Sequence, residues 1–223
     1  VYYFENYVDE ASLTAFVEPI NSALAGMGMN FFGENPVSAG FGLFNAGGII
    51  FMIVGIMLSK GFADKYGKRN VFGIALFIST LFILAFYLFP PTAIGLIFGS
   101  QILHGFLYGL TIPLLWAMIA DVADYSEWKN NRRATAIVFS AMMVGLKAGL
   151  SMGSALLTWI LGLYDYVPNS ATQTESAIHA TKLLVSVYPS IPFLIGTALL
   201  FAYAINKEME NRIETDLKLR RNN

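Results

Sequence analysis

The sequence predicts an all-α integral membrane protein, and three observations lead to this prediction. Hydrophobic side chains make up 56% of the 223 residues and charged side chains only 13%, whereas a soluble domain carries about a quarter charged residues. Five long stretches contain almost no charge, and basic residues gather in every second connection between them. A β-barrel would instead show many short segments of alternating hydrophobicity. We therefore expect a bundle of membrane-spanning helices.

Five segments are long enough to cross a bilayer, which takes about 20 mostly apolar residues in a helix. Those without any Asp, Glu, Lys or Arg are residues 41–59, 71–89, 93–120 and 183–205. Residues 134–164 contain Lys147 as their only charged side chain. Together they predict a five-helix transmembrane bundle over residues 41–206.

The connections predict how this bundle is oriented in the membrane. Lys and Arg are frequent in residues 60–69, 129–133 and 207–223, while residues 90–92 and 165–177 contain none. Because cytoplasmic loops carry the excess of Lys and Arg, we expect a multi-pass protein of the bacterial inner (plasma) membrane with a cytoplasmic C-terminus.

The two ends of the chain are expected to lie on opposite sides of the membrane. Residues 1–40 contain acids but no Lys or Arg. We expect them to form the end of a truncated helix and an acidic outside loop, with a short amphipathic helix around residues 11–25. Residues 207–223 are expected to be a cytoplasmic tail.

Composition and motifs exclude several classes of protein. The absence of Cys rules out disulfides and thiolate metal sites, and a net charge of −1 argues against a nucleic-acid partner. His104 and His179 are too few to build a His-based metal site, and the sequence lacks GxSxG, P-loop and HExxH motifs. We therefore expect neither an enzyme nor a cofactor, and no metal site in this part of the protein.

Lys147 is the most informative residue because it lies about 20 Å from the nearer end of its predicted helix. A lysine at the bilayer centre costs at least ~2.5–3.5 kcal/mol on insertion scales. Helical spacing places it on one face with four hydroxyl side chains, namely Ser140, Ser151, Ser154 and Thr158. Such a face favours a substrate or coupling residue in a water-filled cavity over a purely structural lysine. The hydroxyls could also simply bond to carbonyls of their own helix.

A second polar face is predicted in residues 93–120, where Gln101, His104 and Tyr108 follow helical spacing. A lone His is more often a satisfied core residue than a proton relay. Pro113 in this segment, and Pro189 and Pro192 in the last one, predict kinks or hinges. Two polar faces with hinge prolines fit a solute pathway better than a reaction centre, a scaffold or an intramembrane enzyme.

Two inner loops resemble a known family of membrane proteins. The loop Gly61–Arg69 resembles the short basic loop of the major facilitator superfamily. A sharper pattern is similar to the glycoside–pentoside–hexuronide:cation symporter (melibiose-permease-like) family, and it consists of Asp121, Asp124, Tyr125, Glu127, Lys129, Arg132 and Arg133, followed by Lys147-Ala148-Gly149.

This resemblance implies a fold and a function. The chain would be helices seven (partial) to twelve of a major-facilitator-type bundle, with a missing N-terminal six-helix half as its partner. It would cotransport a sugar, glycoside or hexuronate with Na⁺ or H⁺ by alternating access, within membrane lipid. Lys147 matches the family's helix-eleven lysine near the substrate and cation region, and the cation-binding carboxylates would lie in the other half. A carrier of the same fold for a lysolipid or another organic solute, or a non-transporting scaffold, is the alternative.

The charged residues of the two inner loops are expected to form a cytoplasmic gate. Salt bridges at one end bias the equilibrium between inward- and outward-facing states. Because each exposed pair contributes only about 0–1 kcal/mol, the gate would act as a network with basic groups of the other half. The alternative is solvated interfacial charge. The expected gate residues are Asp64, Arg69, Asp121, Asp124, Tyr125, Glu127, Arg132 and Arg133.

Overall fold

The computed structural model describes residues 2–28, 35–168, 170 and 172–222. Within these residues the chain is helical and contains no strand. Its helices are α1 (Tyr2–Asn6), α2 (Glu10–Gly26), α3 (Pro36–Tyr66), α4 (Lys68–Ala85), α5 (Ile94–Asn130), α6 (Thr135–Leu163), α7 (Glu175–Val185), α8 (Val187–Leu199), the short 3₁₀ helix η1 (Leu200–Ala202) and α9 (Lys207–Asn222). The predicted all-α membrane fold is confirmed.

Five helical units are long and apolar enough to cross a membrane, as the sequence predicts: α3, α4, α5, α6 and the unit from α7 to η1. α3 begins at Pro36 rather than at residue 41, because Asn35 caps it by accepting from the backbone N–H groups of Val37 and Ser38. A proline is tolerated in the first turn, where its missing N–H has no partner in any case.

The fifth unit is interrupted by a break at Ser186, which separates α7 from α8. Pro189 explains the position of this break. A proline ring clashes with the carbonyl group four residues earlier, and that residue is Val185, the last residue of α7. Pro192 and Pro113 lie inside α8 and α5 without ending either helix.

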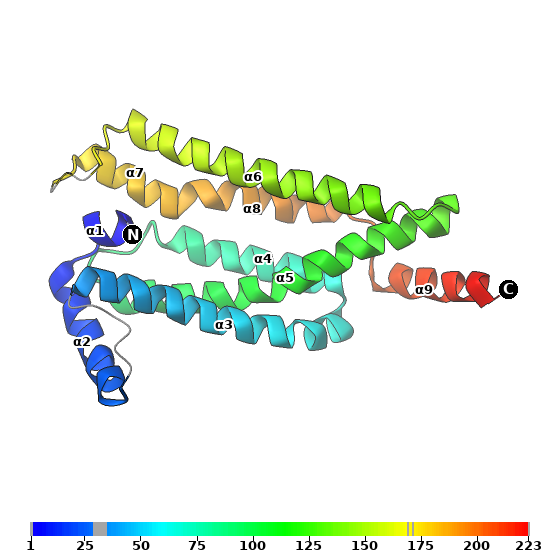
Figure 1. Cartoon of the computed structure of the whole chain (residues 1–223), viewed down its shortest axis with the longest axis horizontal. Helices are drawn as coiled ribbons and strands as arrows, with labels where there is room; N and C mark the ends of the chain where they lie inside the picture. The colour runs from blue at the N-terminus through cyan, green and yellow to red at the C-terminus, as the bar shows by residue number, and fades with distance from the viewer. Residues whose placement is uncertain (1, 29–34, 169, 171, 223) are drawn as a thin grey trace.

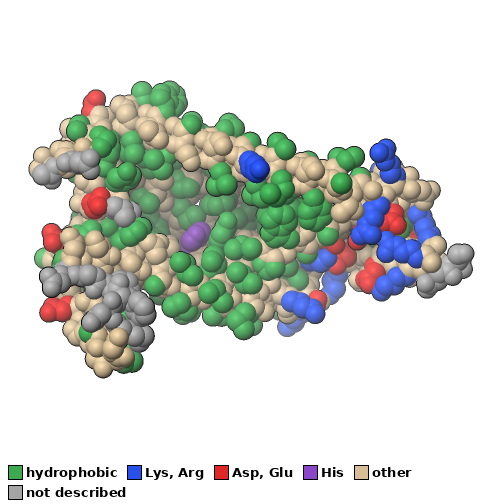
Figure 2. Space-filling model, in the orientation of Figure 1, with side chains coloured by type: hydrophobic (Ala, Val, Ile, Leu, Met, Phe, Trp, Pro, Cys, Tyr) green, Lys and Arg blue, Asp and Glu red, His purple; other side chains and the backbone are tan. Residues whose placement is uncertain are grey.

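Successive membrane units run in opposite directions, so that the basic connections share one end of the bundle (Figure 1). The α3–α4 junction, the α5–α6 loop and α9 lie at this end, and α1 and α2 lie at the other. Figure 2 shows Lys, Arg, Asp and Glu side chains gathered at the α9 end of a largely apolar face. We call the end of the bundle at which α9, the α3–α4 junction and the α5–α6 loop lie the charged end.

α5 is the central helix and packs closely against α3. Three glycines allow this approach. A Cβ atom on Gly105 or Gly109 would lie 2.3 or 2.2 Å from a carbonyl oxygen of α3, and one on Gly55 would lie 2.2 Å from the carbonyl oxygen of Phe106. Small residues at such contacts let membrane helices approach each other.

α6 packs much less against the rest of the described chain than α5 does. No residue in its most apolar 18-residue stretch is buried. A Cβ atom on Gly145, Gly149 or Gly153 of α6 would meet nothing within 4 Å, so these glycines make no close helix contact within the described chain. The apolar core instead lies at the end opposite the charged end, where α1 and α2 pack Phe4 and Leu13 against Phe98 of α5.

Candidate functional site

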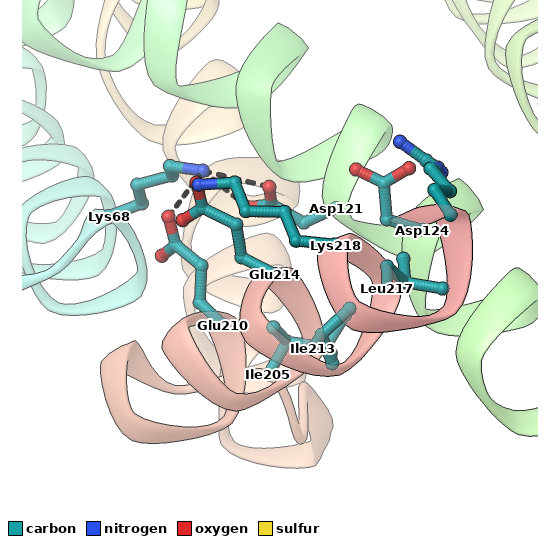
Figure 3. Close-up of a pocket in the computed structure, with 10 residues that line it drawn as sticks. Lys68, Asp121, Asp124, Ile205, Glu210, Ile213, Glu214, Leu217 and Lys218 are labelled. Atoms are coloured by element: carbon teal, nitrogen blue, oxygen red, sulfur yellow. Dashed lines mark hydrogen bonds and ion pairs between the residues drawn. The ribbon is translucent and has the colours of Figure 1, made fainter. Parts of the chain in front are cut away.

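A lysine from α4 organises the charged end. The Nζ atom of Lys68 lies 2.8 Å from both carboxylate oxygens of Asp121 on α5 and 2.8 Å from a carboxylate oxygen of Glu210 on α9. Figure 3 shows Lys68 reaching toward both acids. The side chains of Lys68 and Asp121 are 23% and 16% exposed, so water screens this pair less than a surface pair. One ammonium group therefore links three helices.

A second set of ion pairs joins the α5–α6 loop to α5 and α9. Arg133 pairs with Asp124 at 3.2 Å and with Glu127 at 3.6 Å. Arg221 of α9 donates to both carboxylate oxygens of Glu127 at 3.1 and 3.0 Å. Glu127 thus holds two arginines from different segments. Together with the Lys68 pairs, these contacts form what we call the charge network.

An apolar contact docks α9 beneath this network. Ile205, Ile213 and Leu217 are buried together, and Trp128 of α5 donates from Nε1 to Asp216 of α9 at 2.8 Å. Tyr125 packs against the same cluster. Because apolar burial carries most of the docking energy of such a helix, the ion pairs set the register of α9 rather than hold it alone.

A cavity of about 350 Å³ remains between α9 and the ends of α4 and α5 at the charged end. Figure 3 shows Lys68, Asp121 and Asp124 on one side of it and residues of α9 on the other. Lys218 lowers the pKa of Glu214 by hydrogen bonding, so that Glu214 stays ionised. Burial raises the pKa of Tyr203, whose neutral hydroxyl donates to the Met118 carbonyl at 3.2 Å.

The remaining predicted gate residues take other positions. Arg69 donates weakly, at 3.5 Å, to the Phe201 carbonyl. Asp64 contributes its backbone carbonyl, which accepts from Lys207. Arg132 likewise uses its carbonyl, which accepts from Ser126. These three residues therefore border the charge network without an ion pair of their own in the described part of the chain.

The sequence analysis did not predict three residues of the charge network, namely Lys68, Glu210 and Arg221. Lys68 was visible only as one basic loop residue among several. The tail did contain a signal, because Ile205, Met209, Ile213 and Leu217 recur at a spacing of four in a charged segment. This spacing indicates an amphipathic helix with one buried face.

The polar residues of α5 contact three different helices. Gln101 lies against Gly48 of α3, where an added Cβ would approach its Nε2 atom to 2.6 Å. Nδ1 of His104 lies 2.7 Å from the hydroxyl of Ser79 on α4. Tyr108 stacks on His104 and contacts Phe193 of α8. His104 is thus a partnered interior residue.

Lys147 and its hydroxyl neighbours lie on the exposed surface of α6. Ser154 and Thr158 donate to carbonyls of their own helix at 2.9 and 3.0 Å. Ser151 is exposed as well. Among the described residues no hydrogen bond or ion pair joins Lys147 to Gln101, His104 or Tyr108. The structure therefore does not bring the two predicted polar faces together.

Comparison with known proteins identifies the family. Residues 16–207, which include all five membrane units, match the family model described as MFS/sugar transport protein. The chain belongs to this family of membrane transporters. Its members are carriers rather than enzymes, which agrees with the absence of enzyme motifs from the sequence.

Individual relatives support the same assignment. The chain is 31% identical over 159 residues to a 29.9 kDa protein of Pseudescherichia vulneris. The aligned region covers 71% of this chain and 58% of the relative. The chain is 29% identical over 167 residues (75% and 36%) to the putative glycoside/cation symporter YagG of Escherichia coli. It is also 28% identical over 194 residues (84% and 39%) to the isoprimeverose transporter of Lactiplantibacillus pentosus. The chain thus spans between about a third and three fifths of the curated relatives it matches.

Proposed function

We propose that this chain acts in the cation-coupled symport of a sugar, glycoside or hexuronate by alternating access. The observation that carries the proposal is the family match over all five membrane units, together with relatives named as a glycoside/cation symporter and an isoprimeverose transporter. Na⁺ or H⁺ would be the coupling ion.

The exposed polar face of α6 supports a partner for this bundle. Lys147 would be costly against lipid at mid-membrane, and within the described chain it has no hydrogen-bonding or ionic partner. We propose that six further helices cover this face and enclose a pathway that includes Lys147, Ser151 and Ser154. As the family resemblance implies, the cation-binding carboxylates would belong to those helices.

The charge network is our candidate for the cytoplasmic gate. The basic connections share one end of the bundle, and the excess of Lys and Arg assigns that end to the cytoplasm. By the same rule α9 would be cytoplasmic, and a relative named as an inner membrane symporter of Escherichia coli supports an inner-membrane location. Because α9 is tied to α4 and α5 there, any opening of this end would have to break or carry along those contacts.

Replacing Lys147 tests the pathway. In the transporter as its gene encodes it, Lys147→Ala should abolish cation-driven uptake of a radiolabelled glycoside into membrane vesicles, because the pathway loses its central charge. Lys147→Arg should retain part of the activity. Lys60→Ala, an exposed lysine near the charged end of α3, serves as the matched control and should transport normally. Unchanged uptake by Lys147→Ala at normal expression would contradict the site.

A further inference from the structure

An apolar groove runs along the outer surface of the bundle between α4 and α8. These two helices pack side by side. The groove has a volume of about 660 Å³ and is lined by Gly73, Ile74, Phe77, Ile78, Leu194 and Ala198. Gly73 keeps it open, because a Cβ atom there would approach the Leu200 side chain to 3.3 Å.

The groove opens on the exposed surface of the bundle rather than toward its interior. Both walls belong to membrane-spanning units, and its rim is highly exposed, with Ile74 at 61% and Phe201 at 84%. Arg69 stands at one end of the α4 wall and Ile78 at the other. They are about 14 Å apart at 1.5 Å per residue, which is close to half of a hydrocarbon core of roughly 30 Å.

Uncompensated positive charge marks the end of the groove at the charged end. Arg69 and Asn70 line it there, and Arg69 contacts only a backbone carbonyl at 3.5 Å. Lys207 also bonds to carbonyls, those of Asp64 and Lys65. Within the described chain neither cation has a carboxylate partner, whereas Lys68 is paired with two. This corner is therefore suited to an anion.

We propose that this groove binds an anionic phospholipid from the leaflet at the charged end. One acyl chain would lie along Gly73, Phe77 and Ala198, and the headgroup phosphate would contact Arg69. Basic pockets between membrane helices bind anionic headgroups by this combination of charge and apolar surface. The inference goes beyond the proposed transport function and does not depend on it.

Charge complementarity favours a lipid over a second copy of the chain in this groove. In a symmetric dimer the same surface faces itself, so the Arg69 side chains of two copies would approach each other without an acid between them. Bulky side chains such as Phe77 and Phe201 also line the groove, whereas close membrane-helix contacts favour small residues.

The test uses the full chain in vesicles of phosphatidylglycerol and phosphatidylcholine in equal amounts, with identical acyl chains. After release into mild detergent, native mass spectrometry measures which lipid stays bound. We expect phosphatidylglycerol to be retained preferentially. Arg69→Gln should lower that preference about five-fold, which corresponds to ~1 kcal/mol for one basic residue near an anionic surface. Arg132→Gln, an exposed arginine of the α5–α6 loop, should leave it unchanged.

A second pair of variants tests the acyl-chain site. Gly73→Leu should fill the groove and remove the bound lipid, and Ala198→Leu provides the same test if the first variant does not fold. Gly61→Leu is the matched control, because a Cβ atom at Gly61 meets nothing within 4 Å. Retention of lipid by both filled variants would overturn the site.

Two other outcomes would also overturn the proposal. Equal retention of the two lipids would show that Arg69 recognises no headgroup. The chain contains no Cys, so the cysteine of Ile78→Cys can form a disulfide only with the same cysteine of a second copy when the vesicles are oxidised. Efficient formation of a disulfide-linked dimer would show that a second copy occupies the groove instead of a lipid.

Discussion

Lys68 is the residue on which the charged end depends most, because it joins α4 to both α5 and α9. Asp121 lies 53 residues after Lys68 in the sequence, and Glu210 lies further still. These ion pairs therefore stabilise tertiary rather than local structure. A partly buried pair is costly to break from one side, since the partner charge stays behind without compensation.

Removing this ammonium group should destabilise the fold. Lys68→Gln leaves Asp121 and Glu210 facing each other without a cation, and we expect a loss of about 1–3 kcal/mol in the free energy of unfolding. Thermal unfolding in detergent, followed by circular dichroism, measures it. Lys218→Gln is the control, because the Lys218–Glu214 pair is exposed on one face of α9. Equal transition temperatures for the two variants would show that burial gives Lys68 no special role.

At the scale of elements, α5 determines the packing of the bundle. It contains 37 residues and continues beyond the predicted end at residue 120, because the charged residues 121–130 extend the helix past the apolar segment. Its glycines contact α3 in the middle, and its acids meet α4 and α9 at the charged end. One continuous helix thus connects the membrane interior to the charge network.

Adding a methyl group to the α3–α5 contact should be tolerated poorly. Gly109→Ala would place a Cβ atom 2.2 Å from the carbonyl oxygen of Met52, so the two backbones must separate. We expect a cost of about 1–3 kcal/mol, seen as a lower unfolding temperature in detergent. Gly99→Ala on the same helix meets nothing within 4 Å and should unfold like the parent. Ala favours a helix more than Gly does, so helix propensity alone would not destabilise either variant. A loss of the same size in both variants would therefore contradict a special role for the Gly109–Met52 contact.

α9 should undock when its apolar face is trimmed. Leu217 is 5% exposed, whereas Leu219 is 60% exposed. We expect Leu217→Ala to weaken docking by about 2 kcal/mol, the lower limit for a core leucine. Trypsin should then cleave α9 about thirty-fold faster, provided that cleavage follows the open population. Leu219→Ala should be cleaved at the parent rate, and acceleration in that variant alone would contradict this packing.

At the scale of the whole molecule, the charge network and the spans form one connected unit. The membrane units alternate in direction, and α9 ties α4 and α5 together at the charged end. In a transporter that works by alternating access, contacts at one end bias the balance between the two open states. If the proposed gate is correct, loosening this end should shift that balance toward the inward-open state.

Neutralising two acids of the network tests the gate in the intact transporter. Asp121→Asn with Asp124→Asn should increase exposure of the charged end, because Lys68 and Arg133 each lose a partner. The readout is labelling of Ala123→Cys, a position that is 1% exposed, by an impermeant maleimide applied from the cytoplasmic side. The control is Glu208→Gln with Glu214→Gln on α9, which removes the same two negative charges without removing a carboxylate of α5. This double variant should not raise labelling. Similar labelling of both double variants would refute gating by this network.

Amino-acid pattern alone determined the membrane class, the five spans and the gathering of basic connections at one end. These features follow from local physics, because a helix of apolar residues satisfies its own backbone and partitions into lipid wherever it occurs. The pattern also pointed to Asp121, Asp124, Glu127 and Arg133 as one charged group, since all four lie within a single short segment.

Only the tertiary structure decided which groups meet. It paired Asp121 with Lys68 and Glu210, made α9 a docked helix, and gave Gln101, His104 and Tyr108 three different neighbours. It also placed Arg69 beside an apolar groove and left the Lys147 face of α6 exposed. Helical spacing fixes the face on which a side chain lies, but the angle and distance between helices decide what that face contacts. Those depend on side chains far apart in the chain, such as Gly109 against Met52, whose contact no local pattern contains.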